Sequence, residues 1–318
     1  DVCSSDLALP IATGVQEYWR FLHERAREEG KSHPKRVFTD NRMKNNDYAV
    51  QQALAYLDGN QGLVTGRALV LGGASETNLD PLLKAFSEVH VADLSLLTLQ
   101  DVAAKYAPHP NAKRLFLHQV DLSGIPADYQ MDNYNKMIAS GKGENPTPDT
   151  VSDYYKNFPN ILNKLEFSSG KFDLVLSLVL AEYLPYGPVV AAFEKVRAEK
   201  RADRKGIDEL IGGEPFFYRP EVMEVFEEVL MHHRDELNRL VAPTGIIAFS
   251  CWMRPDEKQA TLAKEVKTPL LRVGDDRMTE ATWKKFFDPF KKAIPEKLES
   301  NIGPNPLSTL NLFFLVRR

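Results

Sequence analysis

The chain has 318 residues, 43% of them hydrophobic, enough for one large α/β domain with insertions or for two small domains. Its net charge of −4 and its pI of about 6.0 provide no basic field that would attract nucleic acid or an anionic membrane. Its two cysteines exclude a disulfide framework and a cysteine-ligated zinc, and no apolar stretch approaches the roughly 20 residues that cross a bilayer. We therefore expect a cytoplasmic protein without a nucleic-acid or membrane partner.

The N-terminal part is predicted to be a short tail followed by helices. Residues 1–7, DVCSSDL, lack the regions of a signal peptide and resemble the translation of a sequencing adapter; a disordered native tail is the alternative. Residues 8–62 are predicted to form a helical segment, with amphipathic helices at 15–29 and 47–57. Turn formers that include Gly59 are expected to end the second helix.

A compact nucleotide-binding unit is predicted to follow, beginning with a strand and a tight turn. The apolar run at 68–71 is typical of a buried parallel strand. Gly72, Gly73 and Ala74 come directly after it, and residues this small allow the chain to turn sharply and a ligand to approach the backbone.

Predicted strands and helices then alternate through a domain that we expect to span residues 63–318. The predicted strands lie at 68–71, 88–92, 114–120, 172–180, 245–251, 293–299 and 310–316. The predicted helices lie at 79–86, 96–106, 188–200, 221–241 and 279–287. Two aromatic-rich segments, 123–171 and 201–219, interrupt this order as insertions; their aromatic side chains either cap a substrate pocket or form the core of the insertions themselves. The pattern predicts an α/β fold: a doubly wound, Rossmann-like, seven-stranded sheet with a C-terminal antiparallel hairpin.

Two aspartates stand at the ends of predicted strands. Asp93 follows the second strand about 20 residues after Gly72, where a carboxylate would meet the ribose diol of an adenosine ligand. Asp121 follows the third strand. Because ligands bind at the carboxyl ends of the strands in such sheets, both aspartates are candidate binding residues.

Three blocks of the sequence resemble class I S-adenosylmethionine-dependent methyltransferases. ALVLGGAS at 68–75 lies where that family has its glycine-rich first motif, VHVAD at 89–93 matches its second strand, and FDLVLSLVLAEYL at 172–184 is similar to its fourth-strand motif. The resemblance covers about residues 60–318 and implies methyl transfer with S-adenosylmethionine as cofactor.

The resemblance also implies cofactor-binding residues. These are Gly72, Gly73, Ala74, Asp93, Leu94, Asp121, Leu122, Ser177 and Leu178. In the family, the glycine backbone contacts the methionine part of the cofactor, and the two acidic positions meet the ribose hydroxyls and the adenine amino group. The last pair of residues would line the floor near the methionyl end.

The glycine motif departs from the family pattern. Val70 stands where the family has an acidic residue, and Ala74 and Glu76 replace two glycines. The missing carboxylate weakens the network expected around the ammonium group of the cofactor; Glu76 is one nearby charge that could replace it. A degraded site or a different ligand is therefore an alternative.

The same turn, LGGASETN, also resembles that of short-chain dehydrogenases, which bind nicotinamide cofactors. Those enzymes use a Tyr-x-x-x-Lys pair for proton transfer, and no tyrosine of this chain has a lysine four residues later. Glu76 and Asn78 also occupy positions where that turn needs glycine. An NAD(P)-dependent oxidoreductase and a non-catalytic protein that retains the methyltransferase fold are the two alternatives.

The acceptor is expected to be a small molecule with an oxygen or nitrogen nucleophile. The fourth strand lacks the Asn-Pro-Pro-Tyr sequence of enzymes that methylate DNA bases or protein amides, and the acidic balance opposes a nucleic-acid substrate. Glu182 and Tyr183, just beyond this strand, are the candidates for a catalytic base or substrate contact, or else begin a helix. We expect no metal site. His232 and His233 are adjacent on a predicted helix, so their side chains point about 100° apart and cannot bind one metal ion together; we expect them to be solvated surface residues.

Overall fold

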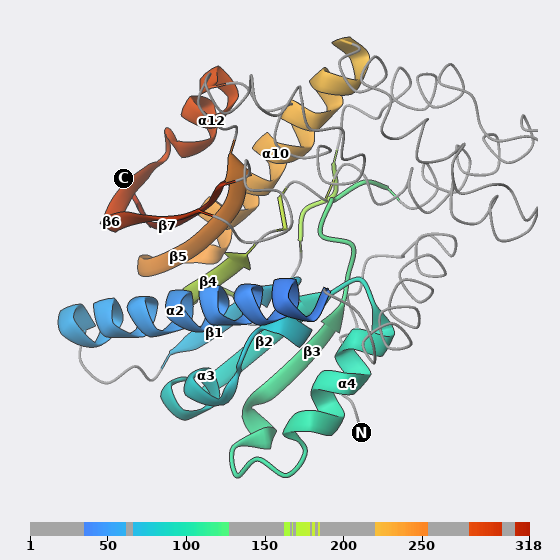
Figure 1. Cartoon of the computed structure of the whole chain (residues 1–318), viewed down its shortest axis with the longest axis vertical. Helices are drawn as coiled ribbons and strands as arrows, with labels where there is room; N and C mark the ends of the chain where they lie inside the picture. The colour runs from blue at the N-terminus through green and yellow to red at the C-terminus, as the bar shows by residue number, and fades with distance from the viewer. Residues whose placement is uncertain are drawn as a thin grey trace, which may run out of the picture.

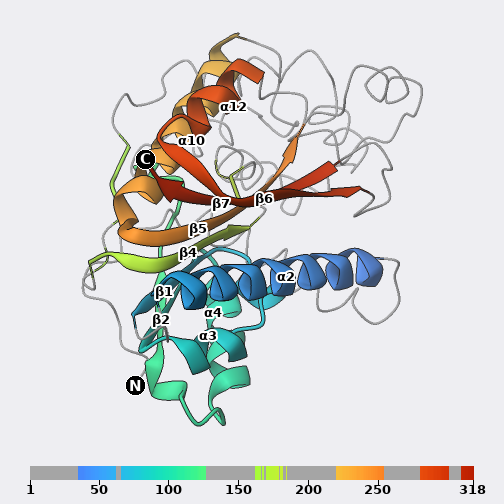
Figure 2. The ribbon, with the colours of Figure 1, turned by 90° about the vertical axis from the view of Figure 1, so that its left-hand side faces the viewer.

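The computed structural model describes ten segments of the chain. These are residues 35–61, 66–126, 162–165, 167, 170–178, 180–181, 184, 220–253, 280–300 and 309–318. The described residues form one seven-stranded sheet, with helices on both of its faces (Figures 1 and 2).

The sheet has the strand order β3-β2-β1-β4-β5-β7-β6. The strands are β1 (Arg67–Leu71), β2 (Glu88–Asp93), β3 (Leu115–Gln119), β4 (Phe172–Leu178), β5 (Val241–Met253), β6 (Phe290–Ser300) and β7 (Thr309–Arg317). The first five strands pair in parallel, whereas β7 is antiparallel to both β5 and β6. The predicted doubly wound sheet with a C-terminal antiparallel hairpin is therefore confirmed.

The helices divide between the two faces of the sheet. They are α2 (Lys35–Gln61), α3 (Asp80–Ala85), α4 (Leu96–Tyr106), α10 (Pro220–Leu240) and α12 (Glu280–Phe287), with short 3-10 turns η1 (Ala74–Glu76) and η2 (Ala112–Arg114). Figure 2 shows α2, α3 and α4 on one face and α10 and α12 on the other. From β1 the sheet extends through β2 and β3 on one side and through β4 and β5 on the other. The strand order therefore reverses between β1 and β4, which is where an open α/β sheet forms its ligand crevice.

Both faces of the central strands are buried. Along β1, Leu69 and Leu71 belong to the core beneath α10 and α12, whereas Ala68 and Val70 belong to the core beneath α2 and α3. This alternation follows from the two-residue period of a strand and explains why the strand is apolar at every central position.

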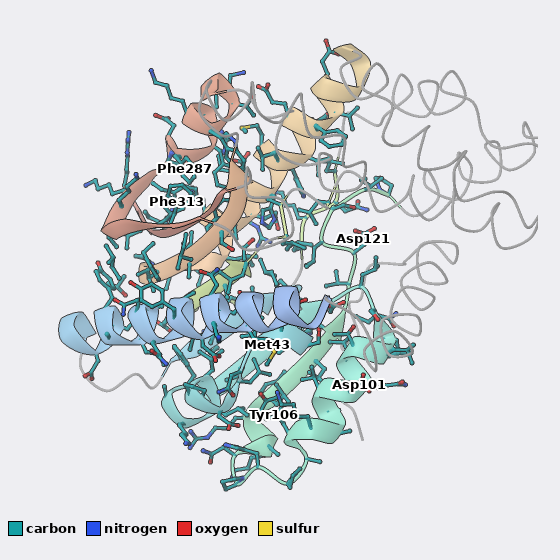
Figure 3. All side chains as sticks on the ribbon, viewed as in Figure 1. Met43, Asp101, Tyr106, Asp121, Phe287 and Phe313 are labelled. Atoms are coloured by element: carbon teal, nitrogen blue, oxygen red, sulfur yellow. The ribbon has the colours of Figure 1, made fainter. Side chains whose placement is uncertain are left out.

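An aromatic cluster joins α12 to the hairpin side of the sheet. The rings of Phe249, Trp283, Phe286, Phe287 and Phe313 lie against one another, with 4.5 Å between the centroids of Phe287 and Phe313 (Figure 3). Aromatic pairs at such separations add to the stability that apolar burial already supplies.

Two predicted elements are clearly longer than expected. The helix expected at 47–57 begins at Lys35 and continues past Gly59 to Gln61, because its apolar stripe of Ala49, Ala53 and Leu57 packs on the sheet. A glycine inside a helix costs only about 0.5–1 kcal/mol, which such packing exceeds. The strand expected from 245 begins at Val241, and its register with β4 shifts between Phe172 and Leu174.

Several sequence predictions fall outside the described residues. They include the tail at 1–7, the helices at 15–29 and 188–200, and most of the segments 123–171 and 201–219. The division at residue 62 also stays a prediction. Within the described part of the chain, no helix combines the length and apolar composition that a membrane span needs.

Candidate functional site

The turn after β1 consists of two glycines without side chains, and it lies where the strand order reverses. Gly72 and Gly73 have φ angles of 64° and 59°, in the left-handed region that favours glycine. The N–H of Gly72 donates to the carbonyl of Ala92 at 2.8 Å, and a Cβ on Gly72 would lie 3.0 Å from Cδ1 of Leu180. On Gly73 the nearest atom to such a Cβ would be the carbonyl oxygen of Leu178, at 3.7 Å.

Side chains of α2 and of the turn itself hold the turn in place. The Thr77 hydroxyl donates to the carbonyl of Gly73 at 3.0 Å, and Nδ2 of Asn46 reaches both Thr77 Oγ1 and the Glu76 carbonyl at 3.3 Å. Ala74, which begins η1, is buried. The glycine turn is thus fixed by one local hydrogen bond, from Thr77, and by Asn46, which is about 30 residues away in the sequence.

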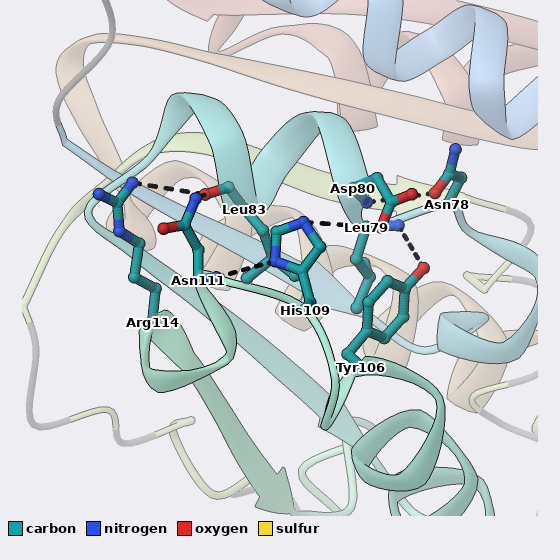
Figure 4. A network of polar contacts seen from close by, with 8 residues as sticks. All are labelled: Asn78, Leu79, Asp80, Leu83, Tyr106, His109, Asn111 and Arg114. Atoms are coloured by element: carbon teal, nitrogen blue, oxygen red, sulfur yellow. Dashed lines mark hydrogen bonds and ion pairs between the residues drawn. The ribbon is translucent and has the colours of Figure 1, made fainter.

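The helix after the turn is fixed at both ends (Figure 4). At its start, the N–H of Leu79 donates to the buried hydroxyl of Tyr106 at 2.8 Å. At its end, the carbonyl of Leu83 accepts from Nδ2 of Asn111 at 3.1 Å and from Arg114 at 3.4 Å. Carbonyls at a helix end lack partners within the helix, so these two side chains stabilise α3.

Asp93 lies at the carboxyl end of β2, as predicted from the sequence. Its Oδ1 accepts from the N–H of Ser95 at 2.8 Å, and its carbonyl accepts from the N–H of Val120 at 3.1 Å. Ser95 in turn caps α4, since its hydroxyl accepts from the N–H of Thr98 at 3.2 Å. Leu94, between the aspartate and the cap, is half-buried.

Asp121 lies just beyond β3, which is the neighbour of β2 in the sheet (Figure 3). Its Oδ1 accepts from both the N–H and the hydroxyl of Ser123, at 2.9 and 2.7 Å. Leu122 beside it is 5% exposed. The structure thus brings the glycine turn, Asp93 and Asp121 to the same edge of the sheet, at the ends of adjacent strands.

The hydroxyl of Ser177 points to α10 and is engaged there. Its Oγ lies 2.9 Å from Nε2 of His233, and both side chains are buried. Any direct contact of Ser177 with a ligand at the strand end would therefore be made by its backbone. Leu178, the last residue of β4, is 5% exposed.

The prediction that His232 and His233 form a solvated surface pair is wrong. His233 is 1% exposed, His232 is only partly exposed, and burial, with a further contribution from His232, lowers the pKa of His233 to about 3. The helical spacing of the buried stripe could have revealed this, because Phe226, Val229, His233 and Leu237 recur every three to four residues.

A second histidine pair lies on β2 and β3, with His90 buried and His118 half-buried. Nδ1 of His90 is 2.8 Å from Nε2 of His118, and Nε2 of His90 is 3.1 Å from the Glu88 carboxylate. Burial, assisted by His90, lowers the pKa of His118 to about 4. Over the described residues, no three His, Cys, Asp or Glu side chains come together as metal ligands.

Glu182 and Tyr183 lie outside the described residues, so their catalytic role stays a prediction. Their neighbours Ala181 and Leu184 are 0% and 7% exposed. Ala181 and Leu184 both belong to the core beneath α10.

The strand order, with antiparallel β7 between β5 and β6, defines the class I methyltransferase fold. Among the solved structures that are similar to this chain is magnesium protoporphyrin IX methyltransferase (ChlM) from Synechocystis with bound S-adenosylhomocysteine. It is 13% identical over 94% of this chain and 99% of that chain, with a TM-score of 0.49.

Two further structures are similar at comparable levels. A S-adenosylmethionine-dependent methyltransferase from Clostridium acetobutylicum is 10% identical over 94% of this chain and 98% of that one, with a TM-score of 0.43. N-methyltransferase NodS from Bradyrhizobium japonicum is 10% identical over 85% and 86%, with a TM-score of 0.42. No protein-family model and no curated protein matches the sequence.

Proposed function

We propose that this chain transfers a methyl group from S-adenosylmethionine to an oxygen or nitrogen nucleophile of a small molecule. The observation that carries the proposal is the pair of left-handed glycines, Gly72 and Gly73, at the strand-order reversal of a sheet with antiparallel β7. Dinucleotide-binding sheets of order 3-2-1-4-5-6 have no such inserted strand, which favours the methyltransferase over the dehydrogenase alternative.

The residues at the sheet edge fit this cofactor. Neither glycine carries a Cβ, so a ligand can approach the backbone of the turn; at Gly73 a Cβ would have only the Leu178 carbonyl oxygen nearby, at 3.7 Å. Gly72 and Gly73 would hold the methionine part, Asp93 the ribose hydroxyls and Asp121 the adenine amino group. When bound, the cofactor supplies a methyl group carried on a positively charged sulfonium.

The protein's own contribution is to orient the acceptor and to exclude water. Positioning of two reactants supplies on the order of 7–11 kcal/mol of the barrier, without an obligatory catalytic triad. Glu182 and Tyr183 remain our candidates for accepting the acceptor's proton or contacting it.

A small acceptor is supported by charge and by the origin of the first insertion. The net charge of −4 opposes binding to a polyanion. Asn163 donates its N–H to the carbonyl of Gly124 at 2.7 Å, so the chain leaves and rejoins the described fold close to Asp121. We propose that the segments 123–171 and 201–219 cap the crevice.

Calorimetry with S-adenosylmethionine and S-adenosylhomocysteine tests the proposal. Binding of both would support an enzyme, and a panel of phenols, amines and carboxylic acids with radiolabelled cofactor would then identify the acceptor class. Binding of neither would favour a non-catalytic protein, binding of NADPH instead would favour the oxidoreductase, and methylation of tRNA or a protein would overturn the acceptor class.

A further inference from the structure

Two consecutive asparagines of α2, Asn45 and Asn46, are buried beside the glycine turn. Each is 2% exposed. Asn46 is anchored by its Nδ2, which donates to Thr77 and to the Glu76 carbonyl. The amide of Asn45 is different, because among the residues that the structure describes neither its Nδ2 nor its Oδ1 has a hydrogen-bond partner, and Oδ1 of Asn46 also lacks one there.

An unpartnered amide in a protein interior calls for an explanation. The large majority of buried polar side-chain atoms make at least one hydrogen bond, because removing an amide from water without a replacement is unfavourable. A leucine has nearly the same shape as asparagine and would remove this cost. The amide of Asn45 is therefore best explained by a polar group that binds there.

The location of Asn45 indicates which group that is. Asn45 directly precedes Asn46, which anchors the turn at Glu76 and Thr77, and its side chain points about 100° around the helix from that of Asn46. In Figure 1 the N-terminal half of α2 lies toward the side to which β3 and β4 point, and Figure 3 labels Met43 on this half. This is the carboxyl edge of the sheet, where the glycine turn lies.

The first strand lacks the acidic side chain that would pair with the ammonium group of the cofactor, because Val70 stands at that position. Val70 of β1 is 1% exposed and shares its core with Ala49 and Val50 of α2, so it faces the same layer as the asparagines. An acidic side chain would be the expected partner of an ammonium group there, and valine cannot serve. An amide offers one acceptor oxygen and two donor hydrogens, which match the ammonium and carboxylate of an α-amino acid.

We propose that Asn45, assisted by Oδ1 of Asn46, binds the α-amino acid end of S-adenosylmethionine. This inference rests on the proposed function and adds a binding residue to it. Helix α2 thereby supplies the polar partner that the first strand lacks.

The experiment compares two ligands that differ in that end. S-adenosylhomocysteine carries the amino acid group, whereas 5′-methylthioadenosine has the same nucleoside and sulfur without it. Calorimetry on Asn45→Leu should show at least a tenfold loss of affinity for S-adenosylhomocysteine and less than a twofold change for 5′-methylthioadenosine. Gln51→Leu, on the exposed side of the same helix, should change neither affinity.

Each outcome has one meaning. Equal weakening of both ligands, or no weakening of either, in a variant that unfolds cooperatively would overturn the role of Asn45 while leaving the proposed function in place. A wild-type protein that binds neither ligand would overturn the proposed function itself. If Asn45→Leu does not fold, Asn45→Ala undergoes the same comparison, because it removes the amide without adding volume.

Discussion

The hydroxyl of Ser177 on β4 lies 2.9 Å from Nε2 of His233 on α10, so a hydrogen bond between two buried side chains joins the central sheet to α10, the longer of the two described helices on that face. A protonated imidazole is strongly disfavoured there, and the pKa of His233 is lowered to about 3. The fold therefore depends on this histidine being neutral.

This dependence predicts loss of stability in mild acid. The pKa values of His233 and His118 are lowered to about 3 and 4, so below pH 6.5 the unfolded chain binds protons that the folded chain does not. Each histidine should lower the free energy of unfolding by about 1.4 kcal/mol per pH unit between about pH 6 and its folded pKa. Urea unfolding at pH 7.5, 6.0 and 5.0 measures this effect. The slope should shrink in His118→Gln, and equal stability at all three pH values would contradict the prediction.

Substitutions in the glycine turn should separate binding from folding. In Gly73→Val we expect S-adenosylhomocysteine binding to be lost, while the left-handed φ of 59° costs about 1–2 kcal/mol or somewhat more for a branched side chain. Gly72→Val should cost more stability, because its Cβ would also press on Leu180. Calorimetry and thermal unfolding measure the two effects. Normal binding by Gly73→Val would show that the turn is only structural.

The carboxylate of Asp93 should contribute to ligand binding beyond its role in the fold. Asp93→Ala should weaken S-adenosylhomocysteine binding by more than tenfold, about 1.4 kcal/mol, through loss of a charge-assisted hydrogen bond. It should also lower stability, since the N–H of Ser95 loses its acceptor. Asp93→Asn keeps an acceptor for Ser95 and is the control, with weakened binding and near-native stability. Unchanged affinity in both variants would rule out the ribose assignment.

Glu236 should be important for stability rather than for chemistry. Its side chain is 3% exposed, accepts from the N–H of Leu165 at 2.7 Å and pairs with Arg239, which also contacts the Leu165 carbonyl. Glu236→Ala should therefore cost about 1–3 kcal/mol, because a buried N–H is left without an acceptor. Glu236→Gln retains an acceptor and should cost less. Urea unfolding measures both, and equal stability of the alanine variant and wild type would contradict the prediction.

The strands and the glycine turn could be predicted because their signals are local. An apolar run such as Leu69–Val70–Leu71 followed by two glycines defines both a strand and its end, and the spacing to Asp93 places the next strand end. Helix α4 matches its predicted bounds, since Ser95 is a standard cap and Pro108 follows its end.

The hydrogen bonds that could not be predicted join residues that are far apart in the sequence. Asn46 reaches Thr77, 31 residues away, and Ser177 reaches His233, 56 residues away. No periodicity in either segment encodes such a pair, because each partner is chosen by the packing of a helix on the sheet. Burial of His233 was detectable from helical spacing, but its partner was not.

The hydrogen bond between Gly124 and Asn163 holds together the two ends of the chain segment 124–163. The entropy of closing such a loop grows only logarithmically with length, about 0.6 kcal/mol for each doubling. Evolution could therefore lengthen, shorten or exchange the intervening residues at little thermodynamic cost to the sheet. The sheet and the segment 124–163 can therefore change independently, so exchange of this segment is a way to alter the acceptor preference while the fold stays the same.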